Sequence, residues 1–167
     1  NHFHGIFDGN GVNFHVTINN PSINNQGLFG YVSQSTSVIE RLSVSGEIRG
    51  NASVGGVVGY MHSGTVRNVY NEATVIGGSS HVGGIVGYIL GSSSERVIVT
   101  NTYNRGEING LSNVGGIVGY VYHDSSSASR STVSHSYSAG QVSGSSGSNV
   151  GGVIGYFSSS RNTRSNL

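Results

Sequence analysis

The sequence predicts an all-β protein built as a parallel β-helix (β-solenoid), right-handed by analogy, and three observations support this. A Gly-rich phrase occurs five times, and a phrase that recurs every 28 to 36 residues is typical of stacked-repeat architectures. A second phrase, in which β-branched residues alternate with small or polar ones, precedes the last four copies and is a strand signal. Helices are hard to place, because glycine interrupts every candidate and no stretch has apolar residues at helical spacing.

The Gly-rich phrase is predicted to form a strand in every coil. In one-letter form it is GLFGY at 27–31, VGGVVGY at 54–60, VGGIVGY at 82–88, VGGIVGY at 114–120 and VGGVIGY at 150–156. We expect its repeat glycines to let neighbouring backbone come close, and they are Gly30, Gly59, Gly87, Gly119 and Gly155. The two adjacent apolar residues of each copy would point to opposite faces of a strand. We therefore expect one face to lie in the core and the other to be covered by a returning loop or a second molecule.

The tyrosine that ends each copy predicts an aromatic ladder. If successive coils are in one-repeat register, equivalent side chains stack, and such ladders stabilise in-register stacking. The predicted ladder consists of Tyr31, Tyr60, Tyr88, Tyr120 and Tyr156. Short amide ladders are expected in the same way between Asn68 and Asn101 and between Asn71 and Asn104.

The second phrase marks where each coil begins. From its first residue to the next ladder tyrosine, the blocks are 39–60, 66–88, 99–120 and 133–156, which contain 22, 23, 22 and 24 residues. A nearly constant block with two or three short strands is typical of one coil of a parallel β-helix. We predict a single solenoid domain over 1–156 that includes a partial first coil at 6–31, and a tail or a connection to further sequence over 157–167. Loops are expected at 61–65, 89–98, 121–132 and 144–149.

Composition argues against several classes of function. Only 9% of the 167 residues are charged, the net charge is +1 and all eight basic residues are Arg, so the basic stripe of a nucleic-acid-binding protein is missing. Cysteine is absent, which rules out disulfides and thiolate metal sites. No apolar run approaches the roughly 20 residues of a membrane span. We expect no cofactor, no nucleic-acid partner and no membrane insertion. The chain opens at Asn1 rather than Met, so we expect a processed product or an excised fragment.

The Gly-rich phrase resembles the GLUG repeat, whose namesake stretch matches Gly27-Leu28-Phe29-Gly30. The other four copies resemble the same motif, and the Tyr-Asn-x-Gly element at 103–106 fits its usual approach, so the resemblance spans residues 25–156. GLUG repeats occur in large bacterial surface and secreted proteins, including adhesins and the accessory regions of IgA1-protease-type metallopeptidases. The resemblance implies an extracellular or bacterial cell-surface location. The His-Glu-x-x-His zinc helix of those metallopeptidases is absent, so their activity is not implied.

Three sets of polar residues are candidates for reactive sites. The histidines mostly fall at different repeat positions, so surface positions are favoured over a metal site; they are His2, His4, His15, His62, His81, His123 and His135. Asp8-Gly9-Asn10-Gly11 looks like the start of a calcium loop, but Asn19 stands at the closing position and a tight turn is favoured. Glu47 and Glu107 share one repeat position two coils apart. If coils repeat at strand spacing, their carboxyl groups would lie about 10 Å apart. Solvated surface charge is favoured over a glycosidase pair.

We therefore predict a non-enzymatic structural protein without catalytic, cofactor-binding or metal-binding residues. It would be the stalk or spacer of an adhesin, or the self-associating body of a surface filament, because open solenoid ends expose strand edges that a longer chain or another copy can cover. The alternative is an adhesin module that binds a glycan or a host surface through the aromatic stripe. A polysaccharide-active β-helix enzyme is the less favoured alternative, because the acids are not paired for it.

Overall fold

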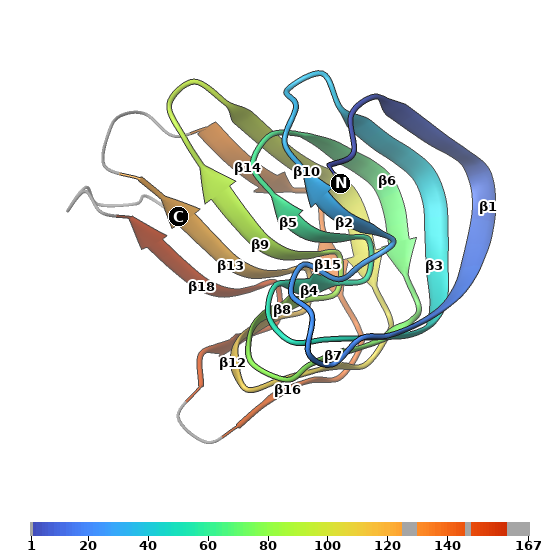
Figure 1. Ribbon diagram of the computed structural model, residues 1–167, viewed down its shortest axis with the longest axis vertical. Helices are drawn as coiled ribbons and strands as arrows, with labels where there is room; N and C mark the ends of the chain where they lie inside the picture. The colour runs from blue at the N-terminus through green and yellow to red at the C-terminus, as the bar shows by residue number, and fades with distance from the viewer. Residues whose placement is uncertain (1, 125–129, 146–147, 160–167) are drawn as a thin grey trace.

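The computed structural model describes residues 2–124, 130–145 and 148–159, and this part of the chain is all-β without a helix. The chain winds into a solenoid whose successive coils lie one above another (Figure 1). All strand pairs named below are parallel, because each strand pairs with its equivalent in the next coil and not with its neighbour in sequence. The predicted fold class, an all-β parallel solenoid, is therefore confirmed.

Each complete coil runs in turn through three sheets, which Figure 1 shows as three stacks of strands. The nine-stranded sheet contains β1 (Ile6–Asn19), β3 (Val38–Gly50), β6 (Gly64–Asn71), β7 (Thr74–Gly77), β10 (Arg96–Asn104), β11 (Ile108–Gly110), β14 (Arg130–Ser134), β15 (Tyr137–Ser138) and β16 (Val142–Gly144). The four-stranded sheet contains β4 (Val54–Gly55), β8 (Ser80–Gly83), β12 (Ser112–Gly115) and β17 (Val150–Gly151). The five-stranded sheet contains β2 (Phe29–Val32), β5 (Val58–Met61), β9 (Val86–Gly91), β13 (Val118–His123) and β18 (Ile154–Ser159).

Equivalent residues of successive coils lie side by side, as the repeat requires. The first residues of the second phrase are in register along the nine-stranded sheet, in the order Ile39, Val66, Val99 and Val133. Because the register is kept from coil to coil, apolar side chains form continuous columns, and these columns make up the core. Removing such columns from water is the main driving force for stacking coils, since a single coil has no other apolar surface to pack against.

The two adjacent apolar residues of the Gly-rich phrase are both buried inside the molecule. Ile85 and Val86 have no exposed surface, and neither do their equivalents in the coils on either side. The phrase is not a single strand, because β8 ends at Gly83 and β9 begins at Val86. The chain bends between these strands, so the alternation of faces along an extended strand is broken at Ile85. The expectation of an outer apolar face that needs a loop or a second molecule is therefore wrong.

Two further bends in each coil are made by non-glycine residues in the left-handed conformation. One column has φ between 49° and 54° and consists of Asn10, Arg41, Asn68, Asn101 and His135. The other has φ between 52° and 65° and consists of Asn25, Ser53, His81 and Asn113. Asparagine supplies five of these nine residues because its short polar side chain tolerates this region better than most others.

The two predicted amide ladders have different outcomes. Asn68 and Asn101 are equivalent bend residues, and no hydrogen bond joins their side chains in the described part of the chain, so that prediction is wrong. Asn71 and Asn104 do form a ladder, because Nδ2 of Asn71 donates to Oδ1 of Asn104 at 2.7 Å and both residues are fully buried. Nδ2 of Asn104 continues the column by donating to Oγ of Ser138 at 3.1 Å.

Each ladder asparagine also holds the backbone bend that follows it. Nδ2 of Asn71 donates to the carbonyl of Ala73 at 2.9 Å, and Oδ1 accepts from the Ala73 amide at 3.2 Å. Asn104 makes the same pair of bonds to Gly106, at 2.9 and 3.1 Å. A buried amide is costly unless its donors and acceptor are satisfied, and here the bend and the next coil satisfy them.

The predicted loops are shorter in the structure than in the sequence analysis. Strand β5 extends to Met61 and β6 begins at Gly64, while β9 extends to Gly91 and β10 begins at Arg96. Most of 61–65 and 89–98 is therefore strand. Within the predicted loops 121–132 and 144–149, residues 125–129 and 146–147 lie outside the described residues, as do residues 160–167 of the predicted tail.

The two ends of the solenoid differ. At the N-terminal end four aromatic rings pack together with centroids 4.8 to 5.6 Å apart, and they belong to Phe3, Phe7, Phe14 and Phe29. At the C-terminal end, residues at core positions are exposed: Val150 is 46% exposed, whereas its register partner Val114 is 0% exposed. Phe157 is 41% exposed and its partner Val121 only 3%. The last coil therefore exposes apolar side chains whose equivalents in the coil beneath it are buried.

Candidate functional site

The tyrosines that end the Gly-rich phrases form one column, which we name the first tyrosine ladder. Tyr31 and Tyr60 stack with ring centroids 4.6 Å apart, and the ladder continues from Tyr88 to Tyr120 at 5.2 Å and from Tyr120 to Tyr156 at 5.5 Å. Tyr60 and Tyr88 meet edge to face instead, at 4.8 Å with an interplanar angle of 69°. The structure thus brings together all five tyrosines that the sequence analysis assigned to this ladder.

Histidine rings extend the first tyrosine ladder. His81, a left-handed residue within β8 of the four-stranded sheet, stacks on Tyr88 at 5.1 Å and on Tyr120 at 4.6 Å. At the N-terminal end His2 stacks on Tyr31 at 4.0 Å. The expectation that the histidines are ordinary surface residues is wrong for His81, which is partly buried among these rings.

Burial changes the ionisation of the groups in the ladder. It lowers the pKa of His81, because the charged imidazolium is less well solvated between the rings. It raises the pKa of Tyr88 to about 12 and raises that of Tyr60 further, because the phenolate form is disfavoured in the same way. Burial therefore favours the uncharged forms of Tyr60, Tyr88 and His81.

The repeat glycines let neighbouring backbone come close, as the sequence predicts. A Cβ atom at Gly87 would lie 2.5 Å from the amide nitrogen of Val54, and one at Gly119 would lie 2.5 Å from that of Val82. The nearest neighbours of Gly30, Gly59 and Gly155 are likewise backbone atoms, 2.5 to 2.9 Å away. No side chain fits at these positions, because backbone atoms cannot move aside as the end of a flexible side chain can.

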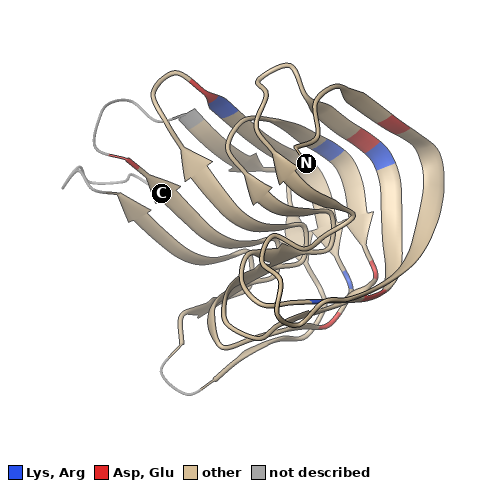
Figure 2. Cartoon of the chain, viewed as in Figure 1, with Lys and Arg blue, Asp and Glu red and all other residues tan. Residues whose placement is uncertain are grey.

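The first tyrosine ladder offers little to a ligand. Most of its ring faces are covered by one another and by His2 and His81, and Tyr156 at the end of the column is exposed. The strands of the five-stranded sheet contain no charged residue, and Figure 2 shows that the charged positions lie mainly on the nine-stranded sheet. The stacked rings hold successive coils in register.

A second tyrosine ladder, absent from the sequence predictions, lies on the nine-stranded sheet and consists of Tyr70, Tyr103 and Tyr137. The ring centroids are 4.1 Å apart between Tyr70 and Tyr103 and 5.4 Å apart between Tyr103 and Tyr137. Tyr70 and Tyr137 are exposed. The signal was present in the sequence, because the fifth residue of the second phrase is Tyr in three copies. In the earliest copy it is Ser43.

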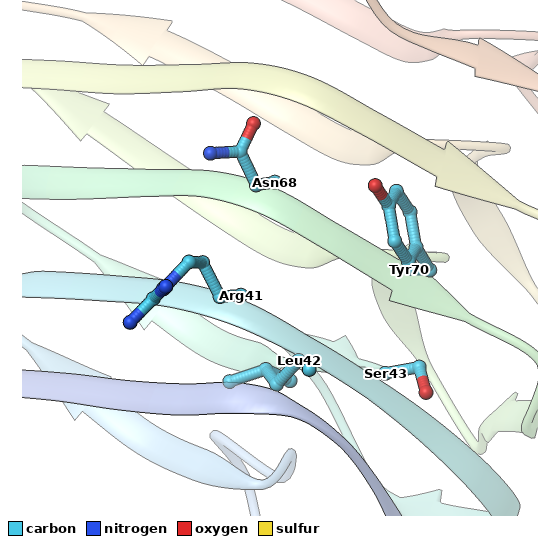
Figure 3. Close-up of a pocket in the computed structure, with 6 residues that line it drawn as sticks. Arg41, Leu42, Ser43, Asn68 and Tyr70 are labelled. Atoms are coloured by element: carbon cyan, nitrogen blue, oxygen red, sulfur yellow. The ribbon is translucent and has the colours of Figure 1, made fainter.

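An open pocket of about 270 Å³ lies at the point where the second tyrosine ladder stops. Its lining residues come from β1, β3 and β6 and are Gly11, Arg41, Leu42, Ser43, Asn68 and Tyr70. Figure 3 shows Arg41, Leu42 and Ser43 on one strand, with Asn68 and Tyr70 on the strand beside it. This pocket combines an aromatic ring, an apolar residue and several hydrogen-bonding groups.

The acids singled out in the sequence are engaged with neighbours on their own strands or coils. Oε1 of Glu47 accepts from Nε of Arg49 at 2.6 Å, and this bond lowers the pKa of Glu47. Oε1 of Glu107 accepts from Nδ2 of Asn109 at 3.0 Å. Thr74 lies between the two acids, since it pairs with Glu47 and Val75 is bonded to the Glu107 carbonyl. This arrangement gives neither carboxylate the role of a general acid.

The segment from Asp8 to Gly11 is neither a calcium loop nor a tight turn. It lies within β1, where the pairing with β3 is interrupted between Asp8 and Val12 by a bulge. Oδ1 of Asp8 accepts from the Asn10 amide at 2.9 Å and from Nε of Arg41 at 2.8 Å. The Arg41 hydrogen bond, more than any other interaction, lowers the pKa of Asp8. Over the described ranges no three His, Asp or Glu side chains are grouped so that they could hold a metal ion.

Comparison of this chain with protein-family models, curated proteins and solved structures gives no match. Among the described residues there is also no helix of the length and apolarity needed to cross a membrane.

Proposed function

We propose that this chain is a non-enzymatic structural segment of a bacterial extracellular protein, a rigid rod whose C-terminal coil is completed by a further layer of strands. One observation carries the proposal: apolar residues at core positions are exposed in the last coil and buried in the coil beneath it. Val153 is exposed, whereas its equivalent Ile117 is fully buried. A Cβ at Gly152 would meet no atom within 4 Å, while one at Gly116 would crowd Ser138. Unpaired strand edges and uncovered core positions form the surface onto which a solenoid adds its next coil.

The internal order of the rod supports a spacer role. The first tyrosine ladder and the apolar columns run through successive coils, and a hydrogen bond joins Asn71 to Asn104, so that bending the rod would separate stacked groups. Only the resemblance to GLUG repeats supports the extracellular and bacterial assignment. The further layer is supplied either by a second copy, as in a filament, or by another coil of a longer chain, as in a stalk.

The proposal is tested by sedimentation velocity of the 167-residue chain over a wide range of concentrations. We expect association that grows with concentration and that Val153→Asn abolishes. Ile23→Asn is the matched control, because Ile23 is a similarly exposed apolar side chain outside the last coil and its replacement should leave association unchanged.

A second measurement covers the case of a longer chain. A variant carrying a second copy of residues 133–159 after the last coil should unfold at a higher temperature than the original chain, because the added coil buries Val150, Val153 and Phe157. A chain that stays monomeric at all concentrations and gains no stability from the added coil would refute the proposal.

A further inference from the structure

The pocket beside Tyr70 exists because the repeat pattern lacks side chains there. Tyr103 covers one face of Tyr70, but the register partner on the other side is Ser43, which is too small to cover a ring. Gly11, in the bulge of β1, adds no side chain, and a Cβ there would meet no atom within 4 Å. A half-covered aromatic ring is therefore left beside a pocket that Leu42, itself only 2% exposed, also lines.

The walls of the pocket carry hydrogen-bonding groups without a net charge. Arg41 forms an ion pair with Asp8, using Nε and one Nη nitrogen. Figure 3 shows the Arg41 side chain directed along its strand away from Tyr70, so its guanidinium lies at the edge of the pocket and not beside the ring. The amide of Asn68 and the hydroxyl of Ser43, which accepts from Asn13 at 2.9 Å, complete the polar rim. The charge of Arg41 is already matched, and this favours a neutral ligand over an anion.

We propose that this pocket binds the pyranose ring of a neutral sugar, which packs its apolar C–H face on Tyr70 and takes a hydrogen bond from Asn68. A pyranose has one face of C–H groups and a rim of hydroxyls, and it thus matches an aromatic ring bordered by donors. A volume of about 270 Å³ suits one ring and not an oligosaccharide. This inference does not depend on the proposed structural function.

The test is a titration of the isotope-labelled chain, followed by nuclear magnetic resonance, with the methyl glycosides of glucose, galactose, mannose and N-acetylglucosamine. At least one should shift the Asn68 side-chain amide signals in a saturable way, with a Kd on the order of 1 mM for a ligand of this size. Methyl glucuronide is the charged comparator and should bind no more tightly than the best neutral sugar.

Ser43→Tyr is the decisive variant, because it extends the second tyrosine ladder by one ring and fills the cavity while leaving Tyr70 and Asn68 in place. It should fold and bind sugar at least tenfold more weakly. Tyr70→Ala should lose binding as well. Tyr137→Ala is the matched control, since Tyr137 is an exposed ring of the same ladder outside the pocket, and it should bind as the unaltered chain does.

Three results would each overturn the inference: no saturable shift with any of the four neutral sugars, unchanged binding by folded Ser43→Tyr, or tighter binding of the glucuronide. The first two deny the site, and the third denies the charge argument made from Arg41 and Asp8. None of them affects the association measurements that test the structural function, so the two proposals can fail separately.

Discussion

Replacing Gly84 by alanine tests whether the second glycine of the Gly-rich phrase is required by the asparagine ladder. A Cβ at Gly84 would lie 2.6 Å from Cγ and 2.9 Å from Cβ of Asn104, and closer still to the carbonyl oxygen of Gly116. Real Cβ atoms essentially never approach other atoms within 3.0 Å. Neither neighbour can move aside easily, because one is backbone of the next coil and the other is a buried amide with its hydrogen bonds made.

The same replacement at Gly152 is the matched control, because Gly152 has the equivalent position in the last coil and open space around it. Overpacking costs about 1–3 kcal/mol, and reducing the freedom of the unfolded chain returns about 0.4–1 kcal/mol. Since the contacts at Gly84 are with backbone and with a fixed side chain, we expect a net loss of about 2 kcal/mol there. At Gly152 only the gain remains, up to about 1 kcal/mol.

Thermal unfolding followed by circular dichroism measures the difference. For a chain of this size 1 kcal/mol corresponds to roughly 2–4 °C, so the melting temperatures of Gly84→Ala and Gly152→Ala should differ by roughly 6–12 °C. Each variant is compared with the unaltered chain at one protein concentration, because association would also shift the melting temperature. Equal melting temperatures for the two variants would refute the argument that the ladder requires glycine at this position.

Val114 and Val150 share a register position but differ in burial. In urea denaturation, Val114→Ala should lower the free energy of unfolding by about 2 kcal/mol and Val150→Ala by less than about 1 kcal/mol. Equal losses would contradict an open C-terminal coil. Burial lowers the pKa of His81 in the folded chain. The unfolded chain therefore binds more protons than the folded chain once the pH falls below the ordinary histidine pKa of 6.5. The free energy of unfolding should decline as the pH falls from that value to the lower folded pKa. His81→Asn, which suits the left-handed bend, should show a smaller decline between about pH 7 and about pH 5, and an unchanged decline would rule His81 out as its source. Burial raises the pKa of Tyr88 to about 12, so ultraviolet titration should show Tyr88 ionising after the exposed tyrosines. The stability associated with its neutral form should be lost as the pH rises above about 10. A single common ionisation near about pH 10 would contradict this prediction.

The parts of the fold that repeat could be predicted, because a repeated pattern shows which residues share a column. The register of Tyr60, Tyr88 and Tyr120 and the bond between Asn71 and Asn104 follow directly from that logic. The second tyrosine ladder could have been predicted in the same way, because Tyr70, Tyr103 and Tyr137 share one position of the second phrase. Only the tyrosines of the Gly-rich phrase were assigned to a ladder.

Features that depend on a break in the pattern could not be predicted in this way. The pocket beside Tyr70 arises where Ser43 interrupts the second ladder and a bulge in β1 places Gly11 nearby, and a single strand sequence does not show which neighbours meet across coils. His81 likewise joins the first tyrosine ladder from a left-handed position in β8, a strand of a different sheet. Alternation along a strand says nothing about such bends, because a left-handed residue changes the direction of the chain.

The sequence by itself determined the period, the parallel register and therefore the identity of the stacked columns, since identical phrases can bury their apolar side chains only against their own copies. The tertiary structure alone decided where each residue of a phrase points. Ile85 and Val86 are both interior because the chain turns between β8 and β9, and Val150 is exposed only because it occupies the last coil. Direction depends on backbone bends and burial depends on the next coil, and neither is a local property of the amino-acid pattern.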